Sequence, residues 1–383
     1  MRSKCIVCGS DLLPNPLYVC KNMPAMSQKL PTINNLAEDK PMDFNLCQCS
    51  GCGLVQFDCN PVPYYLDSTR AGERCDALID LRQKQYKHLI ETYNLKGKKI
   101  IEYGAGKGGF LRTLKEMKHY CISEYGIEYN KEFVKIADEK EGVNVFHGNP
   151  ENDEIIYDGA PYDAFVTFAY PARLIKPNKM FQSVKKNLAD GGIGLVQVPS
   201  LEHLLRRGGF YDITADHIAY YSKDTLRFML QKNGFDILEE GEVGGLYIYA
   251  IVKKRVEYDL QRIWSDVSVI ADSVKNYVKK IKDEKKKIAV WCAGHFAFTV
   301  LSTTNIGKDV SYIIDNASFK QGCYAPASHV KIVGPDYFYK EPVDIIMILG
   351  PLYINELIKE VHNRLSASIK IVTVGSSGLL ELN

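Results

Sequence analysis

The sequence lacks the features that direct proteins to membranes or to nucleic acids. No apolar run approaches the roughly 20 residues that a membrane-spanning helix requires. The first ten residues, MRSKCIVCGS, contain no apolar core of a secretory signal peptide. The 48 basic and 46 acidic side chains leave a net charge of +2, which gives no electrostatic reason for binding nucleic acid or a membrane surface. We therefore expect a cytoplasmic protein with neither kind of partner.

Disulfide bonds are also not expected, although the sequence contains 11 cysteines. Without an export signal the chain is expected in a reducing compartment, where clustered cysteines more often bind a metal. The 383 residues predict two or three domains, and a composition of 46% hydrophobic and 25% charged residues is typical of globular proteins. The chain is thus expected to fold as several globular domains, one of which holds a metal ion.

Two short cysteine motifs predict the metal site. Cys5 and Cys8 belong to one C-x-x-C-G motif, and Cys49 and Cys52 belong to a second. In each motif two thiolates share a tight turn that the glycine makes possible, and two such turns supply the four sulfur ligands of a tetrahedral zinc site. We predict that zinc folds an N-terminal domain of residues 1–75, which is too small to be stabilised by its own core.

Other cysteines leave the ligand set open at this point. The two motifs lie about 40 residues apart, farther than in a minimal zinc ribbon, so a loop must be inserted between them. Cys47 shares a strand face with Cys49 and is an alternative ligand, and Cys20 is a weaker candidate. Four reduced, buried cysteines without a metal are the remaining interpretation.

Residues 99–112, KIIEYGAGKGGFLR, predict a strand, a tight turn and a helix in immediate succession. Glycines allow the turn to adopt backbone angles that a Cβ atom forbids, and they let a ligand approach the backbone closely. The helix that follows presents free backbone N–H groups toward that ligand. A glycine turn that only packs a helix on a sheet is the alternative to a ligand site.

Two ligand-binding templates fit this turn. Gly104, Gly106 and Gly109 match the dinucleotide fingerprint G-x-G-x-x-G. Glu102 and the glycines at 104, 106 and 108 match E-x-G-x-G-x-G, which resembles motif I of class I S-adenosylmethionine (SAM) methyltransferases. Neither match by itself decides between NAD and SAM.

Three further side chains favour SAM. Glu102 precedes the glycines, where the ammonium group of the methionine moiety needs an anionic partner. Glu128 ends the next predicted strand, 20 residues beyond Gly108, where ribose hydroxyls need a carboxylate acceptor. Asn149 follows a third strand, and in methyltransferases the corresponding tip reads the adenine edge. We therefore expect SAM as the cofactor, bound by Glu102, Gly104, Gly106, Gly108, Glu128 and Asn149.

Strands and helices alternate from residue 99 to residue 198, which predicts an α/β fold with a doubly wound, mostly parallel sheet. This pattern defines an expected SAM-binding methyltransferase domain of residues 76–255. Apolar residues at helical spacing then predict a linker helix over 256–287. A second alternating pattern predicts a Rossmann-like C-terminal domain over 288–383.

A second nucleotide site in this C-terminal domain stays open. Asp315 ends a predicted strand and lies 21 residues after Gly294, which is again the spacing of a ribose-binding acid. Only one glycine marks the preceding turn, so the pattern does not decide whether a nucleotide binds.

The full layout resembles the sugar C-methyltransferases, enzymes that methylate nucleotide-linked keto-deoxysugars. The resemblance covers nearly the whole chain. It is carried by the two cysteine motifs, the glycine turn, Gly126-Ile127-Glu128 and residues 315–326, which look like the family's D-x-x-x-x-K-Q-G-x-x-x-P. It implies a zinc-binding N-terminal domain, a class I methyltransferase domain and a Rossmann-like C-terminal domain. It also implies a nucleotide-linked sugar as the small-molecule substrate.

The family's catalytic signature, Y-H-E-H, aligns with residues 214–217, which read Thr-Ala-Asp-His. The last histidine of the signature is the proposed base, so the resemblance implies that His217 accepts a proton, with Asp216 beside it. An imidazole titrates near neutrality and can take a proton from a carbon acid or a hydroxyl. A hydrogen-bonded structural histidine is the alternative. The family also implies a tyrosine near the transferred methyl group, and Tyr65 is the matching candidate.

The substrate side departs from the family pattern. Thr214 and Ala215 replace the tyrosine and the first histidine, and the family's later H-G-G-S reads Val-Gly-Gly-Leu at 243–246. The predicted function is a SAM-dependent methyltransferase for a nucleotide-linked sugar or related sugar metabolite, with carbon, oxygen or nitrogen as the acceptor atom. The alternatives are an O- or N-methyltransferase for another small metabolite, an NAD-dependent oxidoreductase and a non-enzymatic zinc-bearing scaffold. The oligomeric state stays open.

Overall fold

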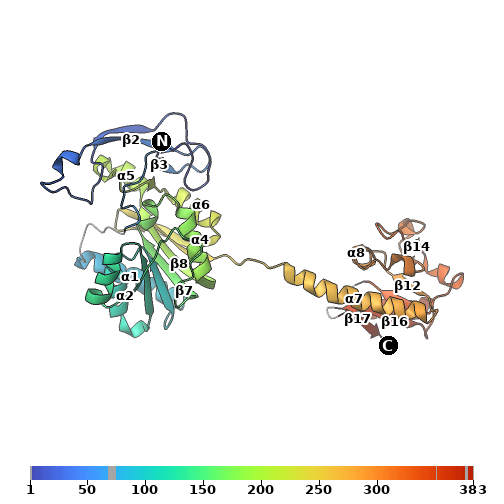
Figure 1. The fold of residues 1–383 in the computed structure, drawn as a ribbon. Helices are drawn as coiled ribbons and strands as arrows, with labels where there is room; N and C mark the ends of the chain where they lie inside the picture. Colours follow the sequence, from blue (N-terminus) through green and yellow to red (C-terminus); the bar gives the residue numbers. More distant parts are fainter. Residues whose placement is uncertain (1, 68–74, 351, 376–377, 383) are drawn as a thin grey trace. The chain divides into compact units, whose positions relative to one another are not determined.

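The computed structural model of the protein describes residues 2–67, 75–350, 352–375 and 378–382. The chain forms two compact units, Met1–Val256 and Glu257–Asn383 (Figure 1). No helix in the described part of the chain is both long enough and apolar enough to cross a membrane.

The first unit is built on a seven-stranded sheet with the order β10-β11-β8-β7-β4-β5-β6. Strands β4 to β8 run parallel, and β11 and β10 add an antiparallel hairpin at one edge. The strands span β4 Lys99–Tyr103, β5 Ser123–Glu128, β6 Asn144–His147, β7 Tyr162–Phe168, β8 Leu188–Pro199, β10 Phe235–Val243 and β11 Tyr247–Lys254. The order reverses between β4 and β7, and ligands of open α/β sheets bind in the crevice at such a reversal.

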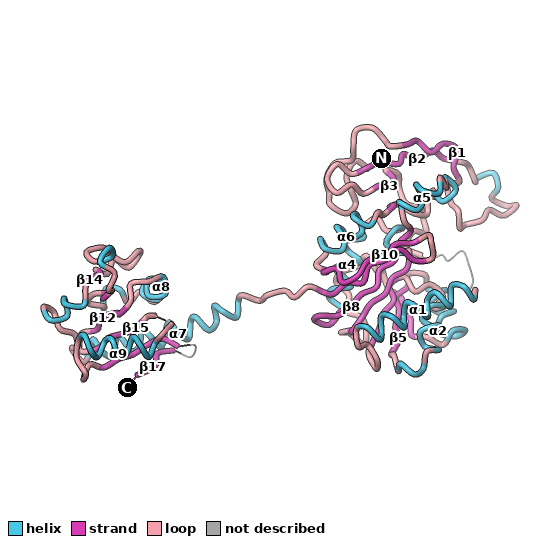
Figure 2. Tube along the Cα trace, turned by 180° about the vertical axis from the view of Figure 1, so that it is seen from behind, coloured by secondary structure: helices cyan, strands magenta, loops and turns pink. Residues whose placement is uncertain are grey.

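Helices cover both faces of this sheet (Figures 1 and 2). Successive residues of a strand point to opposite faces, so Ile100 joins a core with α1 and α2, while Ile101 joins a core with α4 and α6. The helices span α1 Asp76–Thr92, α2 Gly109–Glu116, α3 Lys131–Ile136, α4 Pro177–Asn187, α5 Leu201–Arg207 and α6 Lys223–Lys232. Burial on both faces explains the continuous apolar runs of the parallel strands.

The predicted α/β fold is therefore confirmed, but the hairpin of β10 and β11 was not predicted. Buried and exposed residues alternate along β10, so only one of its faces is apolar and its sequence signal is weak. Strand β11 inserts between β8 and β10, with Tyr247 opposite Pro199. Strand β8 is distant from β11 in the chain, so no local sequence pattern predicts that the two strands pair.

A four-stranded sheet forms an N-terminal lobe of the first unit, with the order β1-β2-β3-β9. The strands span β1 Tyr18–Met23, β2 Met42–Gln48, β3 Val55–Phe57 and β9 Ala219–Tyr220. The fourth strand thus comes from the segment directly after His217. The rings of Phe57 and Tyr220 pack edge to face across the junction, with centroids 5.7 Å apart. The domain boundary expected at residue 75 adjoins residues 68–74, which lie outside the described residues.

The second unit contains a six-stranded sheet with the order β14-β13-β12-β15-β16-β17. All strands are parallel except β17, which pairs antiparallel with β16. The elements span α7 Gln261–Asp283, β12 Ile288–Trp291, α8 His295–Thr303, β13 Ile313–Ile314, β14 Ile332–Val333, β15 Ile345–Ile348, α9 Ile354–Arg364, β16 Lys370–Gly375 and β17 Gly378–Leu382. This strand order is that of Rossmann folds, which confirms the predicted fold of this part.

The long helix α7 packs on the sheet of the second unit. Val274, Val278 and Ile281 are buried on one side of the helix, in a core shared with β12 and β15. The hydroxyl of Ser273 accepts a hydrogen bond from the N–H of Leu379 in β17 at 3.0 Å. The helix expected to link two domains therefore also contributes to the core of the second.

Candidate metal centre and active site

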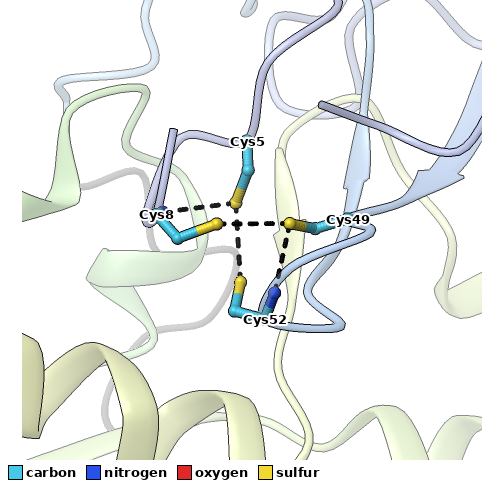
Figure 3. A group of neighbouring side chains, drawn as sticks. All are labelled: Cys5, Cys8, Cys49 and Cys52. Carbon is cyan, nitrogen blue, oxygen red and sulfur yellow. Dashed lines mark hydrogen bonds between the residues drawn. The ribbon is translucent and has the colours of Figure 1, made fainter. Parts of the chain in front are cut away.

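The thiols of Cys5, Cys8, Cys49 and Cys52 form one compact cluster (Figure 3). Their sulfur atoms all lie within 4.8 Å of one another. The Sγ atoms of Cys5 and Cys52 are 3.6 Å apart, and those of Cys8 and Cys49 are 3.3 Å apart. Tetrahedral zinc with Zn–S bonds of about 2.3 Å places its sulfurs roughly 3.8 Å apart. The cluster therefore fits a zinc ion after small adjustments.

The two cysteine turns have the same backbone geometry. Gly9 donates its N–H to the carbonyl of Cys5 at 3.1 Å, and Gly53 donates to the carbonyl of Cys49 at 3.2 Å. Both glycines have left-handed backbone angles, with φ of +80° and +79°. Backbone N–H groups also donate to the sulfurs of Cys5, Cys8 and Cys49. Such bonds favour the thiolate form that a metal requires.

The chemistry of the thiols also fits a metal. Burial raises the pKa of Cys5 to about 11 and raises that of Cys52 further, so metal binding must release protons. The sulfur of Cys47 instead faces the carbonyl of Asn45 at 3.7 Å, and Cys20 is buried in the core of the lobe. Neither alternative ligand belongs to the cluster.

The metal centre is connected to the predicted base through two short strands. Cys52 lies just before β3, and β3 pairs antiparallel with β9. The N–H of Phe57 also donates to the carbonyl of Ile218 at 2.9 Å. His217 directly precedes this carbonyl, so the cysteine turn supports the backbone that carries the histidine.

The glycine turn between β4 and α2 has the geometry that its sequence predicts. Gly104, Gly106 and Gly108 have φ of +79°, +58° and +82°, which side chains with a Cβ rarely adopt. A Cβ atom on Gly104 would also lie 2.5 Å from the ring of Tyr170, and one on Gly108 would lie 2.6 Å from Val143. Both the backbone angles and the packing therefore require glycine.

The two predicted carboxylates lie beside this turn, at the carboxyl ends of neighbouring parallel strands. Glu102 in β4 pairs with Gly126 in β5, two residues before Glu128. The buried Glu128 carboxylate accepts hydrogen bonds from the N–H groups of Gly106 at 2.8 Å and Asn130 at 2.9 Å. Both bonds hold this carboxylate at the carboxyl end of β5, where the ribose contact is predicted.

Asn149 lies just after the carboxyl end of β6, and Tyr65 reaches the same turn through Glu151. The turn after β6 is tied to β5, because Gly148 donates to the carbonyl of Glu128 at 3.0 Å. The side chain of Asn149 accepts from the N–H of Glu151 at 2.9 Å, and Tyr65 donates its hydroxyl to the carboxylate of Glu151 at 3.2 Å. Burial, with Glu151 adding to it, raises the pKa of Tyr65 to about 12, so its hydroxyl stays protonated.

The segment of Asp216 and His217 forms a turn before β9. Asp216 is 1% exposed, and its Oδ2 accepts from the N–H of Ser27 at 3.0 Å and from the hydroxyl of Thr214 at 3.2 Å. The ring of His217 lies nearly perpendicular to that of Tyr220, at 6.4 Å. The described hydrogen bonds of Asp216 thus fix the turn to the N-terminal lobe.

Burial is the main cause of the low pKa of His217, which falls to about 4. The positive charge of Arg173 lowers the pKa further, and Asp216 acts in the opposite direction. The imidazole is therefore neutral at neutral pH and able to accept a proton.

Arg173 was missed by the sequence patterns, and Tyr64 was noted there only beside Tyr65, as a tyrosine able to reach over the cofactor site. The short helix Tyr170–Ala172 follows β7 and ends at Arg173, whose Nη2 lies 3.9 Å from Oδ1 of Asp216 and 3.5 Å from the carbonyl of Tyr64. Burial raises the pKa of Tyr64, and Asp216 contributes to this shift, so Tyr64 is the tyrosine nearer the Asp216 turn. The sequence did offer one signal for Arg173. It is a single basic residue in the mostly apolar segment that follows β7.

The connection between the metal centre and the His217 turn generates a prediction. Chelation of the metal, or Cys52→Ser, should speed amide hydrogen exchange in residues 214–221, because β3 loses its fixed position. Exchange in residues 99–112 should not change. Mass-spectrometric exchange and a zinc assay provide the measurement.

The exposed Cys75 offers a matched control, since Cys75→Ser leaves the cluster intact. Equal protection of residues 214–221 with and without metal would contradict the proposed support.

Two family models match the chain. The model of a methyltransferase domain matches residues 77–240, and the model of a C-methyltransferase C-terminal domain matches residues 258–374. A comparison with curated protein sequences returns no match.

Similar solved structures include two SAM-dependent methyltransferases. One from Clostridium acetobutylicum is 13% identical and aligns over 46% of this chain and 92% of that chain, with a TM-score of 0.39. One from Aquifex aeolicus is 18% identical and aligns over 48% of this chain and 100% of that chain, with a TM-score of 0.37. The family models set aside an NAD-dependent oxidoreductase and a non-enzymatic scaffold. The chain is a SAM-dependent methyltransferase that carries the C-terminal domain of the C-methyltransferase family.

Proposed function

We propose that this methyltransferase acts on a nucleotide-linked sugar or a related sugar metabolite, and that His217 is the base of the reaction. The observation that carries the proposal is that one short element touches both the glycine turn and the segment of His217. Tyr170 packs on Gly104, and Arg173 lies beside Asp216. A cofactor on the glycine turn and an acceptor beside His217 would therefore be neighbours. The C-methyltransferase C-terminal domain favours carbon as the acceptor atom, and the resemblance to the sugar C-methyltransferases implies a sugar.

Each cofactor-binding residue has a distinct role in this proposal. SAM supplies an electrophilic methyl group when it is bound. Glu102 pairs with the ammonium group, Glu128 accepts the ribose hydroxyls, and Asn149 reads the adenine edge. Gly104, Gly106 and Gly108 let the nucleoside approach the backbone closely. These groups lie at the carboxyl ends of adjacent strands, where ligands of such sheets bind.

His217 takes a proton from the acceptor while the acceptor atom attacks the methyl group. Its low pKa keeps the imidazole neutral before the reaction. The proton adds a charge to a partly buried ring, and the carboxylate of Asp216 offsets that charge. Methyl transfer depends mainly on alignment and exclusion of water. We assign Tyr65, held by Glu151, to the wall beside the methyl group.

Methylation of oxygen or nitrogen on another small metabolite is the second candidate. The observation that favours it is the presence of Thr214 and Ala215 where the family signature has a tyrosine and a histidine. The hydroxyl of Thr214 bonds to Asp216, so this position supports the turn here. Mass spectrometry of candidate acceptors after incubation with SAM distinguishes the two, because the product gains one methylene unit at a defined atom.

His217→Asn should lower turnover by about 10²- to 10⁴-fold, the usual contribution of a general base. SAM affinity should stay unchanged, because His217 lies outside the glycine turn. Steady-state kinetics and calorimetry provide the two measurements. His329→Asn, an exposed histidine in the second unit, is the matched control. Full turnover by the His217 variant with SAM still bound would eliminate this base.

The pH dependence of kcat/KM follows from the same group. A base with a lowered pKa stays unprotonated above that pKa, so kcat/KM should not change through the neutral range. It should fall only as the pH decreases toward about 4. A decline centred near the ordinary histidine pKa would show that the free enzyme uses a different base.

Glu128→Gln should weaken SAM binding by about 10- to 100-fold, because hydrogen bonds to a charged group contribute roughly 1.5–3 kcal/mol. Calorimetry with SAM and with its demethylated product measures this loss. Glu132→Gln, an exposed carboxylate on α3, should bind as the wild type does. Unchanged affinity in the Glu128 variant would remove the ribose contact from the proposal.

A further inference from the structure

Tyr221 carries a buried hydroxyl beside the cysteine cluster. Its side chain is 0% exposed, and its hydroxyl has no hydrogen-bond partner within the part of the chain that the structure describes. Buried tyrosine hydroxyls usually have a partner, because an unpaired polar group in an apolar core costs free energy. The hydroxyl of Tyr221 therefore remains available as a donor.

The strand register places Tyr221 next to the second cysteine turn. Val55 in β3 lies opposite Tyr220 in β9. The next step of this antiparallel register sets Tyr221 opposite Leu54, which directly follows the second C-x-x-C-G motif. The backbone is also held from another side, because the N–H of Leu201 donates to the carbonyl of Tyr221 at 2.8 Å. The tyrosine thus has a defined position beside the turn.

The side chain of Tyr221 lies on the face of the strand that contacts the cysteines. Successive residues of a strand point to opposite faces, and Tyr220 belongs to the core of the four-stranded sheet. Tyr221 belongs instead to the core that includes Cys5 and Cys49. Burial raises the pKa of Tyr221, and the thiols of Cys5 and Cys52 add to this shift. The hydroxyl therefore stays protonated at neutral pH, with those two thiols as its ionisable neighbours.

A zinc ion bound by four thiolates needs hydrogen-bond donors around it, because the loaded cluster carries a net charge of about −2. Backbone N–H groups already donate to three of the sulfurs, those of Cys5, Cys8 and Cys49. The N–H of Leu54 bonds to the fourth, that of Cys52. A negatively charged thiolate accepts hydrogen bonds more strongly than a thiol does. A further donor on this side would therefore stabilise the loaded cluster.

We propose that the hydroxyl of Tyr221 donates a hydrogen bond to the zinc-bound thiolates of Cys5 and Cys52. The sulfurs of these two residues lie 3.6 Å apart, so one donor can serve the pair. Tyr221 also lies four residues after His217, in the segment that contains β9. The bond therefore ties this segment to the metal through a side chain, in addition to the backbone pairing of β9 with β3. Tyr221 acts through the metal ligands and is a positioning residue, whatever the acceptor of the methyl group is.

Tyr221→Phe tests this role, because it removes the hydroxyl and keeps the ring. The variant is expected to lower the zinc affinity of the full-length protein about 10- to 100-fold, the usual loss when a partner of a metal ligand is removed. Competition with a chromogenic chelator measures the affinity. Tyr157→Phe is the matched control and should bind zinc as the wild type does. Tyr157 also has a buried hydroxyl without a partner in the described residues, and burial alone raises its pKa to about 12.

Cobalt in place of zinc provides a second readout, which a loss of packing would not reproduce. A hydrogen bond lowers the energy of the sulfur electrons, so its loss in Tyr221→Phe should shift the sulfur-to-cobalt charge-transfer band to longer wavelength. The band of Tyr157→Phe should stay at the wild-type position.

Wild-type zinc affinity or an unshifted band in Tyr221→Phe would overturn the assignment. An equal loss of affinity in Tyr157→Phe would identify a general effect of core packing and would overturn it as well. A wild-type protein that bound no zinc would overturn the metal centre and the assignment together.

Discussion

The pairing of β3 with β9 is the contact on which the rest of the site depends. It joins the cysteine cluster to the backbone of His217, and the N–H of Phe57 extends it by bonding to the carbonyl of Ile218. The N–H of Ser27, from the loop inserted between the cysteine motifs, holds Asp216 from the same side. The small lobe around the cysteine cluster thus positions the turn of Asp216 and His217, which belongs to another part of the chain.

Burial makes the polar groups of this site dependent on one another. It lowers the pKa of His217 to about 4 and also lowers that of Arg173. Arg173 and Asp216 then shift the pKa of the histidine in opposite directions. In surroundings of low dielectric such interactions are stronger than in water, so burial and Arg173 favour the neutral imidazole while Asp216 opposes them. A strongly shifted pKa that arises from burial together with a specific charged neighbour is one mark of a functional site.

Much of the fold followed from local sequence pattern. Strands β4 and β7 lie in the stretch 99–198 where strands and helices were predicted to alternate, because strands buried on both faces are continuous apolar runs. The glycine turn followed from backbone angles that other residues rarely adopt. The hairpin of β10 and β11 did not follow, because only one face of β10 is buried. Strand β9 did not follow either, since two residues carry no periodicity.

The sequence by itself determined the cysteine turns, the glycine turn and the alternation of strands and helices, and its acidic residues favoured SAM over NAD as the cofactor. These features depend on angles and spacings among neighbouring residues. Only the tertiary structure decided that β9 completes the sheet of the lobe, that Tyr64 lies nearer Asp216 than Tyr65 does, and that Arg173 meets Asp216. Such contacts join distant segments, as between Ser27 and Asp216, which are 189 residues apart. Their strength depends on burial, and burial exists only once the chain has folded.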